Sequence, residues 1–202
     1  MKSNFKVLAI AALVSGAFAS APALAASGTS TASPASVANN LNLKIVIPNF
    51  LSFRVGTVGA TVDTITFSPT AANVGNSVSQ TGAGGDAAAG SGSNVSVQGN
   101  NGQVVIGTTV TGGGNGMGTG TAADGFISYA QVTTSSSDAA NFPAPTLANA
   151  GIGNVNVTLG GGVAGAGKVT NRTAVWTYGY ANTTFPSAGS YTGTVTYTAT
   201  MP

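Results

Sequence analysis

The side chains that most often carry catalysis are scarce in this 202-residue chain. It has no His and no Cys, and its four acidic residues are Asp63, Asp86, Asp124 and Asp138. These stand singly, whereas glycosidases and aspartic proteases need a pair of neighbouring carboxylates. Lys168 is a candidate base for a Ser nucleophile, but no Ser-x-x-Lys pattern surrounds it. We therefore expect no catalytic residue, no enzymatic activity and no cofactor.

Three Gly-rich segments, 82–93, 112–121 and 160–167, have the composition of ligand-binding loops. A phosphate loop requires a Lys followed by Ser or Thr and then a helix, and these segments lack that order. A calcium-binding β-roll requires tandem repeats that each carry Asp, and each segment holds at most one. We interpret the segments as loops between strands, and weak calcium binding by Asp86 or Asp124 stays open.

Trp176, Tyr178 and Tyr180 alternate along one predicted strand, so they share a face. Aromatic rings on one face could stack on sugar rings, which makes a secreted, monomeric carbohydrate-binding module the alternative function. We favour core packing for these rings, because the opposite face, which carries Thr177 and Gly179, is poorly suited to a core.

The rest of the sequence predicts strands and turns. No window shows helical spacing of apolar residues, and Thr, Val, Gly and Asn dominate. The Asn-Gly step at 101–102 predicts a hairpin between the strands on either side of it. The chain thus indicates an all-β fold, an Ig-like β-sandwich of about nine strands with Gly-rich loops. The predicted strands cover 41–47, 50–55, 61–67, 94–97, 104–110, 126–134, 155–159, 169–180 and 191–201.

The N-terminus has the three parts of a secretory signal peptide. Lys2 and Lys6 precede an apolar run over 7–19, and Ala-Leu-Ala at 23–25 supplies small residues for cleavage. The apolar run is shorter than the ~20 residues that a spanning helix needs. We expect residues 1–25 to be removed, residues 26–40 to form a flexible leader, and residues 41–202 to form a single domain with no membrane span.

Removal of the signal peptide would also change the charge. The full chain has six basic and four acidic residues, and loss of Lys2 and Lys6 leaves four of each, a net charge of zero. No basic surface for nucleic acid remains. We expect an exported protein that does not bind nucleic acid.

Both ends of the expected mature chain alternate with a period of two. Thr occupies every even position from 192 to 200, and apolar residues occupy most odd positions. Such alternation predicts a strand with one apolar face and one solvent face. The C-terminal pairing set is Gly189, Tyr191, Val195, Tyr197 and Met201. The N-terminal set, interrupted by Asn39, is Val37, Leu41, Leu43, Ile45 and Ile47.

The stretch 185–200, Phe-Pro-Ser-Ala-Gly-Ser-Tyr-Thr-Gly-Thr-Val-Thr-Tyr-Thr-Ala-Thr, resembles the C-terminal strand of chaperone–usher pilus subunits. It is most similar to the cysteine-free, alternate-type major fimbrial subunits and to spore coat protein U-like secreted proteins. In these families a Gly about fourteen residues from the end precedes the alternating strand, as Gly189 does here. Met201 departs from the pattern, because many pilins have an aromatic residue at the penultimate position.

The resemblance implies a structural subunit of an extracellular filament that contributes to adhesion. Its sandwich would lack one strand, and residues 37–47 of another copy would complete it as a donor strand. The implied partners are other copies of the chain, a periplasmic chaperone and an outer-membrane usher. The implied route runs through the periplasm to the cell surface. The residues alone leave open whether 41–47 pairs within its own chain or with a neighbour.

Overall fold

The computed structural model describes residues 28–59, 62–151, 153–165 and 167–202, and the predicted signal peptide lies outside these ranges. The chain divides into two units, Met1–Val46 and Ile47–Pro202. Residues 28–46 form no strand or helix. The strand predicted over 41–47 is thus not formed in the single chain, since a strand needs a neighbour to bind its backbone groups.

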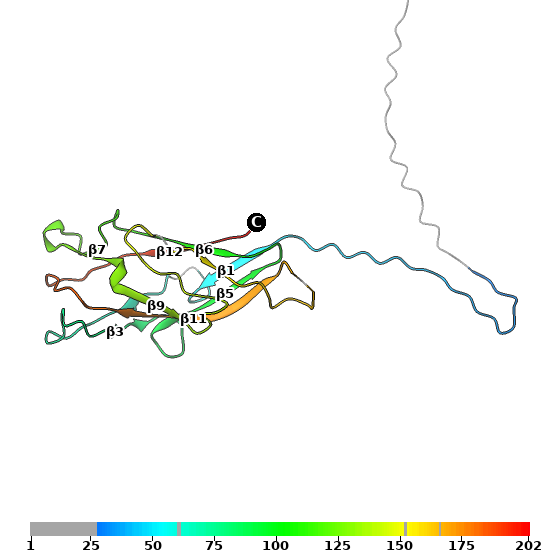
Figure 1. Ribbon diagram of the computed structural model, residues 1–202, viewed down its shortest axis with the longest axis horizontal. Helices are drawn as coiled ribbons and strands as arrows, with labels where there is room; N and C mark the ends of the chain where they lie inside the picture. The colour runs from blue at the N-terminus through cyan, green and yellow to red at the C-terminus, as the bar shows by residue number, and fades with distance from the viewer. Residues whose placement is uncertain (1–27, 60–61, 152, 166) are drawn as a thin grey trace, which may run out of the picture. The chain divides into compact units, whose positions relative to one another are not determined.

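The second unit is all-β, and its strand ladders are antiparallel (Figure 1). In the larger sheet the strand order is β1-β5-β11-β3, and β9 also pairs with β11. The second sheet has the order β10-β6-β12. The strands of the larger sheet are β1 (Leu51–Val55), β3 (Gln80–Thr81), β5 (Gly92–Gly99), β9 (Val132–Ser136) and β11 (Thr170–Tyr180). Those of the second sheet are β6 (Val105–Val110), β10 (Val155–Asn156) and β12 (Val195–Thr200).

Two short ladders complete the described strands, which number twelve against the roughly nine predicted. One pairs β2 (Ile65–Thr66) with β4 (Ala83–Gly84), and the other pairs β7 (Met117–Gly118) with β8 (Phe126–Ile127). Two single-turn 3-10 helices cover Ala122–Asp124 and Tyr129–Gln131. Within the described ranges, no helix is both long and apolar enough to cross a membrane.

The hairpin predicted at the Asn-Gly step is wrong. The strand before it, β5, pairs with β1 and β11, whereas the strand after it, β6, pairs with β10 and β12. The connection therefore crosses from one sheet to the other. The physical reason is burial, because Val95 and Val97 of β5 belong to the same buried cluster as Ile106 of β6. Placement in two different sheets lets these side chains face one another across the interior.

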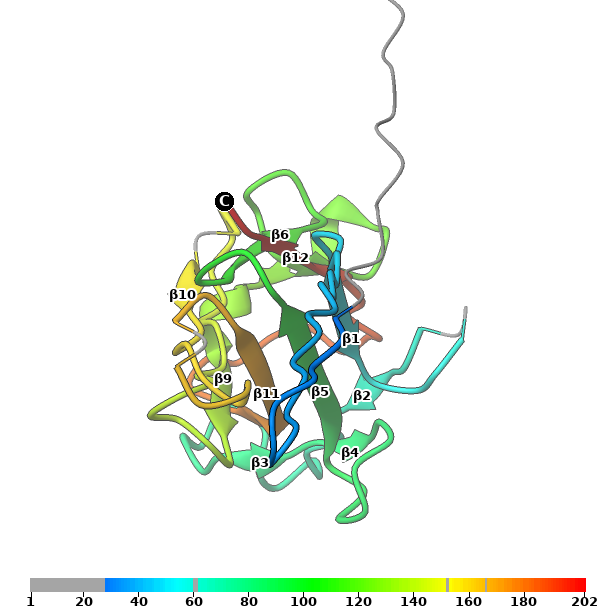
Figure 2. The same ribbon diagram turned by 90° about the vertical axis from the view of Figure 1, so that its right-hand side faces the viewer.

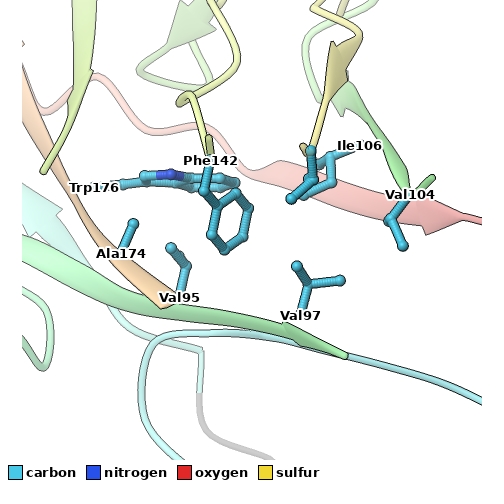
Figure 3. Close-up of a cluster of buried hydrophobic side chains, with 8 residues drawn as sticks. Val95, Val97, Val104, Ile106, Phe142, Ala174 and Trp176 are labelled. Atoms are coloured by element: carbon cyan, nitrogen blue, oxygen red, sulfur yellow. The ribbon is translucent and has the colours of Figure 1, made fainter. Parts of the chain in front are cut away.

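The main core lies between the two sheets (Figure 2). Its side chains point toward one another from β5, β6 and β11, with Phe142 inserted from a loop (Figure 3). Trp176 is fully buried, and its ring makes an edge contact with Phe142 at a centroid distance of 5.4 Å. The buried members of this cluster are Val95, Val97, Val104, Ile106, Phe142, Val157, Ala174 and Trp176.

Candidate strand-acceptor groove

An apolar groove of about 570 Å³ opens between β1 and β12, the edge strands of the two larger sheets. Phe53 and Val55 of β1 line one wall, together with residues 62–65 and Phe67, and Val195 and Tyr197 of β12 line the other. The floor and the remaining lining consist of Ser93, Met117, Tyr129, Val132, Leu147, Tyr178, Gly193, Thr194 and Thr196.

Both strands that border the groove have an unpaired backbone edge. Among the described strands β1 pairs only with β5, and β12 pairs only with β6. An unpaired edge presents a row of N–H and C=O groups that can bind another strand. The groove therefore offers apolar contacts for side chains and hydrogen-bonding groups for a backbone, which together suit a β-strand.

The groove is closed at the end where β1 begins. A methyl group on Gly99 would meet Met201 Sδ at 2.7 Å and Leu51 Cδ1 at 3.4 Å. Met201, which follows β12, and Leu51, which begins β1, therefore lie close together beside Gly99. The groove lining accordingly includes Val55 and Val195 but neither Leu51 nor Met201. The two edges thus meet at this end and leave room between them at the other.

The groove borders both hydrophobic clusters, which Tyr178 connects. Phe53, Val55 and Tyr197 pack on the main cluster, whereas Phe67 and Val195 pack on a second cluster. The buried members of that second cluster are Tyr129, Val132 and Leu147. Apolar side chains placed in the groove would therefore add contacts to both clusters.

Gly193 shapes one part of the groove. A Cβ at this position would collide with the Tyr129 hydroxyl and would lie 2.9 Å from Met117 Cγ. The absence of a side chain lets Tyr129 reach Thr111, whose Oγ1 lies 3.1 Å from the Tyr129 hydroxyl. Gly193 thus allows the second cluster to pack beneath the chain that leads into β12.

Two tyrosine hydroxyls meet on the groove, where Tyr178 of β11 and Tyr197 of β12 lie 3.3 Å apart. Burial raises the pKa of Tyr178 and outweighs the hydrogen bonds to Tyr197 and Ser93, which lower it. Burial also raises the pKa of Tyr197, and both the charge and the hydrogen bond of Tyr178 raise it further. Loss of one proton leaves a phenol–phenolate hydrogen bond between the two rings, whereas loss of both protons leaves two buried charges that repel each other.

We expect stability to fall above about pH 10, the ordinary tyrosine pKa. Because the folded-state pKa of each ring is raised, its stabilising effect is complete below the unfolded value and is lost as the pH rises past it. Phenolate absorbance at 295 nm should show a late phase that coincides with unfolding by circular dichroism. The double variant Tyr178→Phe/Tyr197→Phe should lack that phase. A late phase that persists in this variant would contradict the assignment.

The chain before β1, residues 28–47 and called the leader from here on, supplies a segment that matches the groove. Its alternate apolar side chains are strongly exposed, with Leu41 at 83%, Leu43 at 85%, Ile45 at 87% and Ile47 at 74%. The intervening positions 42, 44 and 46 are Asn, Lys and Val, so an extended conformation would have one apolar face and an opposite face that is polar except at Val46. Residues 41–47 would span about 20 Å at ~3.3 Å per residue, close to the length of a six-residue strand such as β12.

Comparison with protein-family models, with curated proteins and with solved structures finds no match. A proposal for this chain therefore rests on the groove and on the exposed leader.

The C-terminal set of residues divides into two groups. Val195 and Tyr197 lie in β12 and line the groove, and Met201 closes its narrow end. Gly189 and Tyr191 precede the strand, and the Tyr191 hydroxyl donates to the carbonyl of Asp124 at 2.9 Å. Along β12 the Thr side chains are exposed and the intervening residues are half-buried, which matches the alternation in the sequence.

The ligand-stacking interpretation of Trp176, Tyr178 and Tyr180 is wrong. The exposed fraction is 0% for Trp176 and 5% for Tyr180, so neither ring offers a face to a sugar. Tyr178 is half-buried on the groove. The larger sheet turns this face of β11 toward the second sheet, and apolar burial against that layer outweighs solvation of the rings.

The carboxylates considered for calcium bind neighbouring protein groups. Asp86 Oδ1 accepts from the backbone N–H of Asn94 at 2.7 Å, and Asp124 Oδ2 accepts from Thr119 Oγ1 at 2.6 Å. Among the described residues, no three acidic, His or Cys side chains gather where they could hold a metal ion. Both carboxylates thus have local roles in ordering their loops.

Sequence reasoning did not identify the other walls of the groove. Phe53 and Val55 alternate within β1, and this alternation was the available signal that one face of β1 is apolar. Tyr129 and Leu147 carried no such signal, because they lie on a 3-10 turn and in a loop. Their position depends on how loops far apart in the sequence come together.

Proposed function

We propose that this protein is a structural subunit of an extracellular filament that assembles by β-strand addition and contributes to adhesion. In this proposal the second unit is an incomplete Ig-like sandwich, and residues 37–47 of one copy fill the groove of the next. The single observation that carries the proposal is the coexistence of an apolar groove between two unpaired strand edges and an exposed alternating segment in one chain.

The inserted side chains would supply most of the driving force. Burial of Leu41, Leu43, Ile45 and Ile47 at ~1.5–3 kcal/mol each gives roughly 6–12 kcal/mol before ordering costs. Backbone hydrogen bonds to β1 and β12 would set the register. Because donor and acceptor are different surfaces, each added copy exposes a new donor or a new groove, and the assembly grows as a fibre.

Export, passage through the periplasm and help from a chaperone and an usher complete the proposal. An empty apolar groove is a hazard for a soluble chain, because it can bind any exposed strand. A chaperone that covers the groove until a neighbour's leader replaces it would remove that hazard. The near-neutral charge expected for the mature chain would not oppose close packing of copies.

The test compares the mature chain, from Ala26, with the variant Leu43→Asp/Ile45→Asp. We expect the unchanged chain to form filaments by negative-stain microscopy and ladders on denaturing gels that collapse on boiling. The variant should remain monomeric by light scattering, because its leader would have to bury two carboxylates.

The matched control is Asn40→Asp/Asn42→Asp, which adds two carboxylates to the opposite face of the leader. It should polymerise as the unchanged chain does. Equal polymerisation of the two double variants, or a wholly monomeric unchanged chain, would overturn the proposed function.

A further inference from the structure

The side-chain amide of Asn100 holds the point where the leader joins β1. The backbone N–H of Phe50 donates to Asn100 Oδ1 at 3.0 Å, and Asn100 Nδ2 donates to the carbonyl of Pro48 at 2.7 Å. The ladder between β1 and β5 ends at the pair Leu51 and Gly99. Asn100 therefore extends that ladder by one step, with a side-chain amide in place of a peptide group.

Pro48 stiffens the same segment. Its ring fixes φ and removes an N–H, and it biases Ile47 toward extended conformations. The hydrogen bonds of the Asn100 side-chain amide hold the carbonyl of Pro48 and the N–H of Phe50. A chain reversal at residues 48–50 is opposed by these hydrogen bonds, and a reversal at Ile47 is opposed by Pro48.

The position of this segment determines what the leader can reach. It joins β1 at the closed end of the groove, where Leu51 and Met201 lie close together beside Gly99. The leader could enter its own groove from the open end only after the chain reverses direction. A reversal at 47–50 is opposed by Asn100 and Pro48, and a reversal at 44–46 would remove Ile45 and Ile47 from the inserted set.

We propose that Asn100 and Pro48 form an exit clamp that directs the donor segment into the groove of a second copy and away from the groove of its own chain. The inference rests on the proposed function and adds the reason why the donor segment binds a second copy and not its own chain. The clamp touches neither the groove nor the inserted side chains, so Asn100 is a positioning residue. The resulting preference favours filaments over monomers whose own donor segment fills their groove and that cannot grow.

The experiment uses the absence of cysteine in the chain. The mature protein carrying Leu43→Cys/Val195→Cys is produced in normal and ¹⁵N-labelled forms, which are mixed, refolded and treated with a short bis-maleimide. Mass spectrometry then separates links within one chain, which hold a single isotope, from links between chains, half of which hold both. With the clamp intact, links between chains should predominate.

Addition of Asn100→Ala and Pro48→Gly should raise the ratio of links within a chain to links between chains by about tenfold, as expected for the loss of one or two net hydrogen bonds. The control Asn101→Ala removes a neighbouring amide, which donates to the carbonyl of Pro202, and should leave the ratio unchanged. Circular dichroism verifies that each variant folds.

One result would overturn the clamp while leaving the proposed function intact, namely a ratio that does not move when the clamp is removed. Two other results would overturn the proposed function and the clamp with it. These are a predominance of links within one chain when the clamp is present, and the absence of any link between positions 43 and 195 in every variant.

Discussion

A mature chain with Val195→Asp is expected to donate its leader but to accept none. Val195 lines the groove and packs on the second core cluster, so a carboxylate there would be buried beside any inserted strand. The cost of burying an unpaired charge is several kcal/mol, enough to weaken acceptance on the order of a thousandfold. The leader of this variant is unchanged and remains available to other copies.

A mixing experiment separates the two activities. Val195→Asp alone and Leu43→Asp/Ile45→Asp alone should each stay monomeric by light scattering. Mixed in equal amounts they should form heterodimers and nothing longer, because the first variant only donates and the second only accepts. Filaments in the mixture would contradict the assignment of donor and acceptor surfaces.

The matched control for the groove is Thr198→Asp, on the exposed face of the same strand. This variant adds the same charge to β12 without placing it in the groove lining. It should polymerise to the length of the unchanged chain. Loss of polymer in this control as well would indicate that charge on β12, and not occupancy of the groove, limits assembly.

Trp176→Ala should give the largest loss of folding stability. The ring is fully buried between Phe142 and Tyr197, with centroid distances of 5.4 and 5.2 Å. Removing a buried aromatic side chain from a close-packed core typically costs about 3–5 kcal/mol. Urea unfolding followed by circular dichroism measures the difference. The background should be Leu43→Asp/Ile45→Asp, because assembly would add to the apparent stability.

Trp176→Phe is the control for this prediction. Trp176 Nε1 is buried and has no hydrogen-bond partner among the described residues, so its removal leaves no acceptor unpaired. Phe should therefore retain most of the stability that Ala loses. A loss for Phe as large as that for Ala would show that the core depends on the full volume of the indole and that an aromatic ring alone does not replace it.

Local patterns in the sequence predicted much of the strand content. The alternation near the C-terminus predicted β12, and the alternating aromatic residues predicted the core face of β11. Period-two alternation has a local cause, because successive side chains of a strand point to opposite faces. The exposed apolar series from Leu41 to Ile47 was visible in the same way.

The pairing of the strands was not predictable from these patterns. The Asn-Gly step at 101–102 has the chemistry of a hairpin turn, yet the chain crosses between sheets there, because Val97 and Ile106 are buried against opposite layers. Local turn chemistry concerns four residues, whereas the choice of partner depends on burial across the whole domain. The same limit applied to Trp176. The alternation predicted that its side chain lies on the core face of β11, but not which residues would cover it.

The sequence by itself therefore determined the all-β class, the scarcity of reactive side chains and the faces of the terminal segments. The tertiary structure alone decided that β1 and β12 border an unfilled groove, that Tyr129 and Leu147 line it, and that Asn100 holds the leader exit. The reason is that side-chain period is set by neighbours along the chain, while a gap between two sheets is set by residues about 140 positions apart.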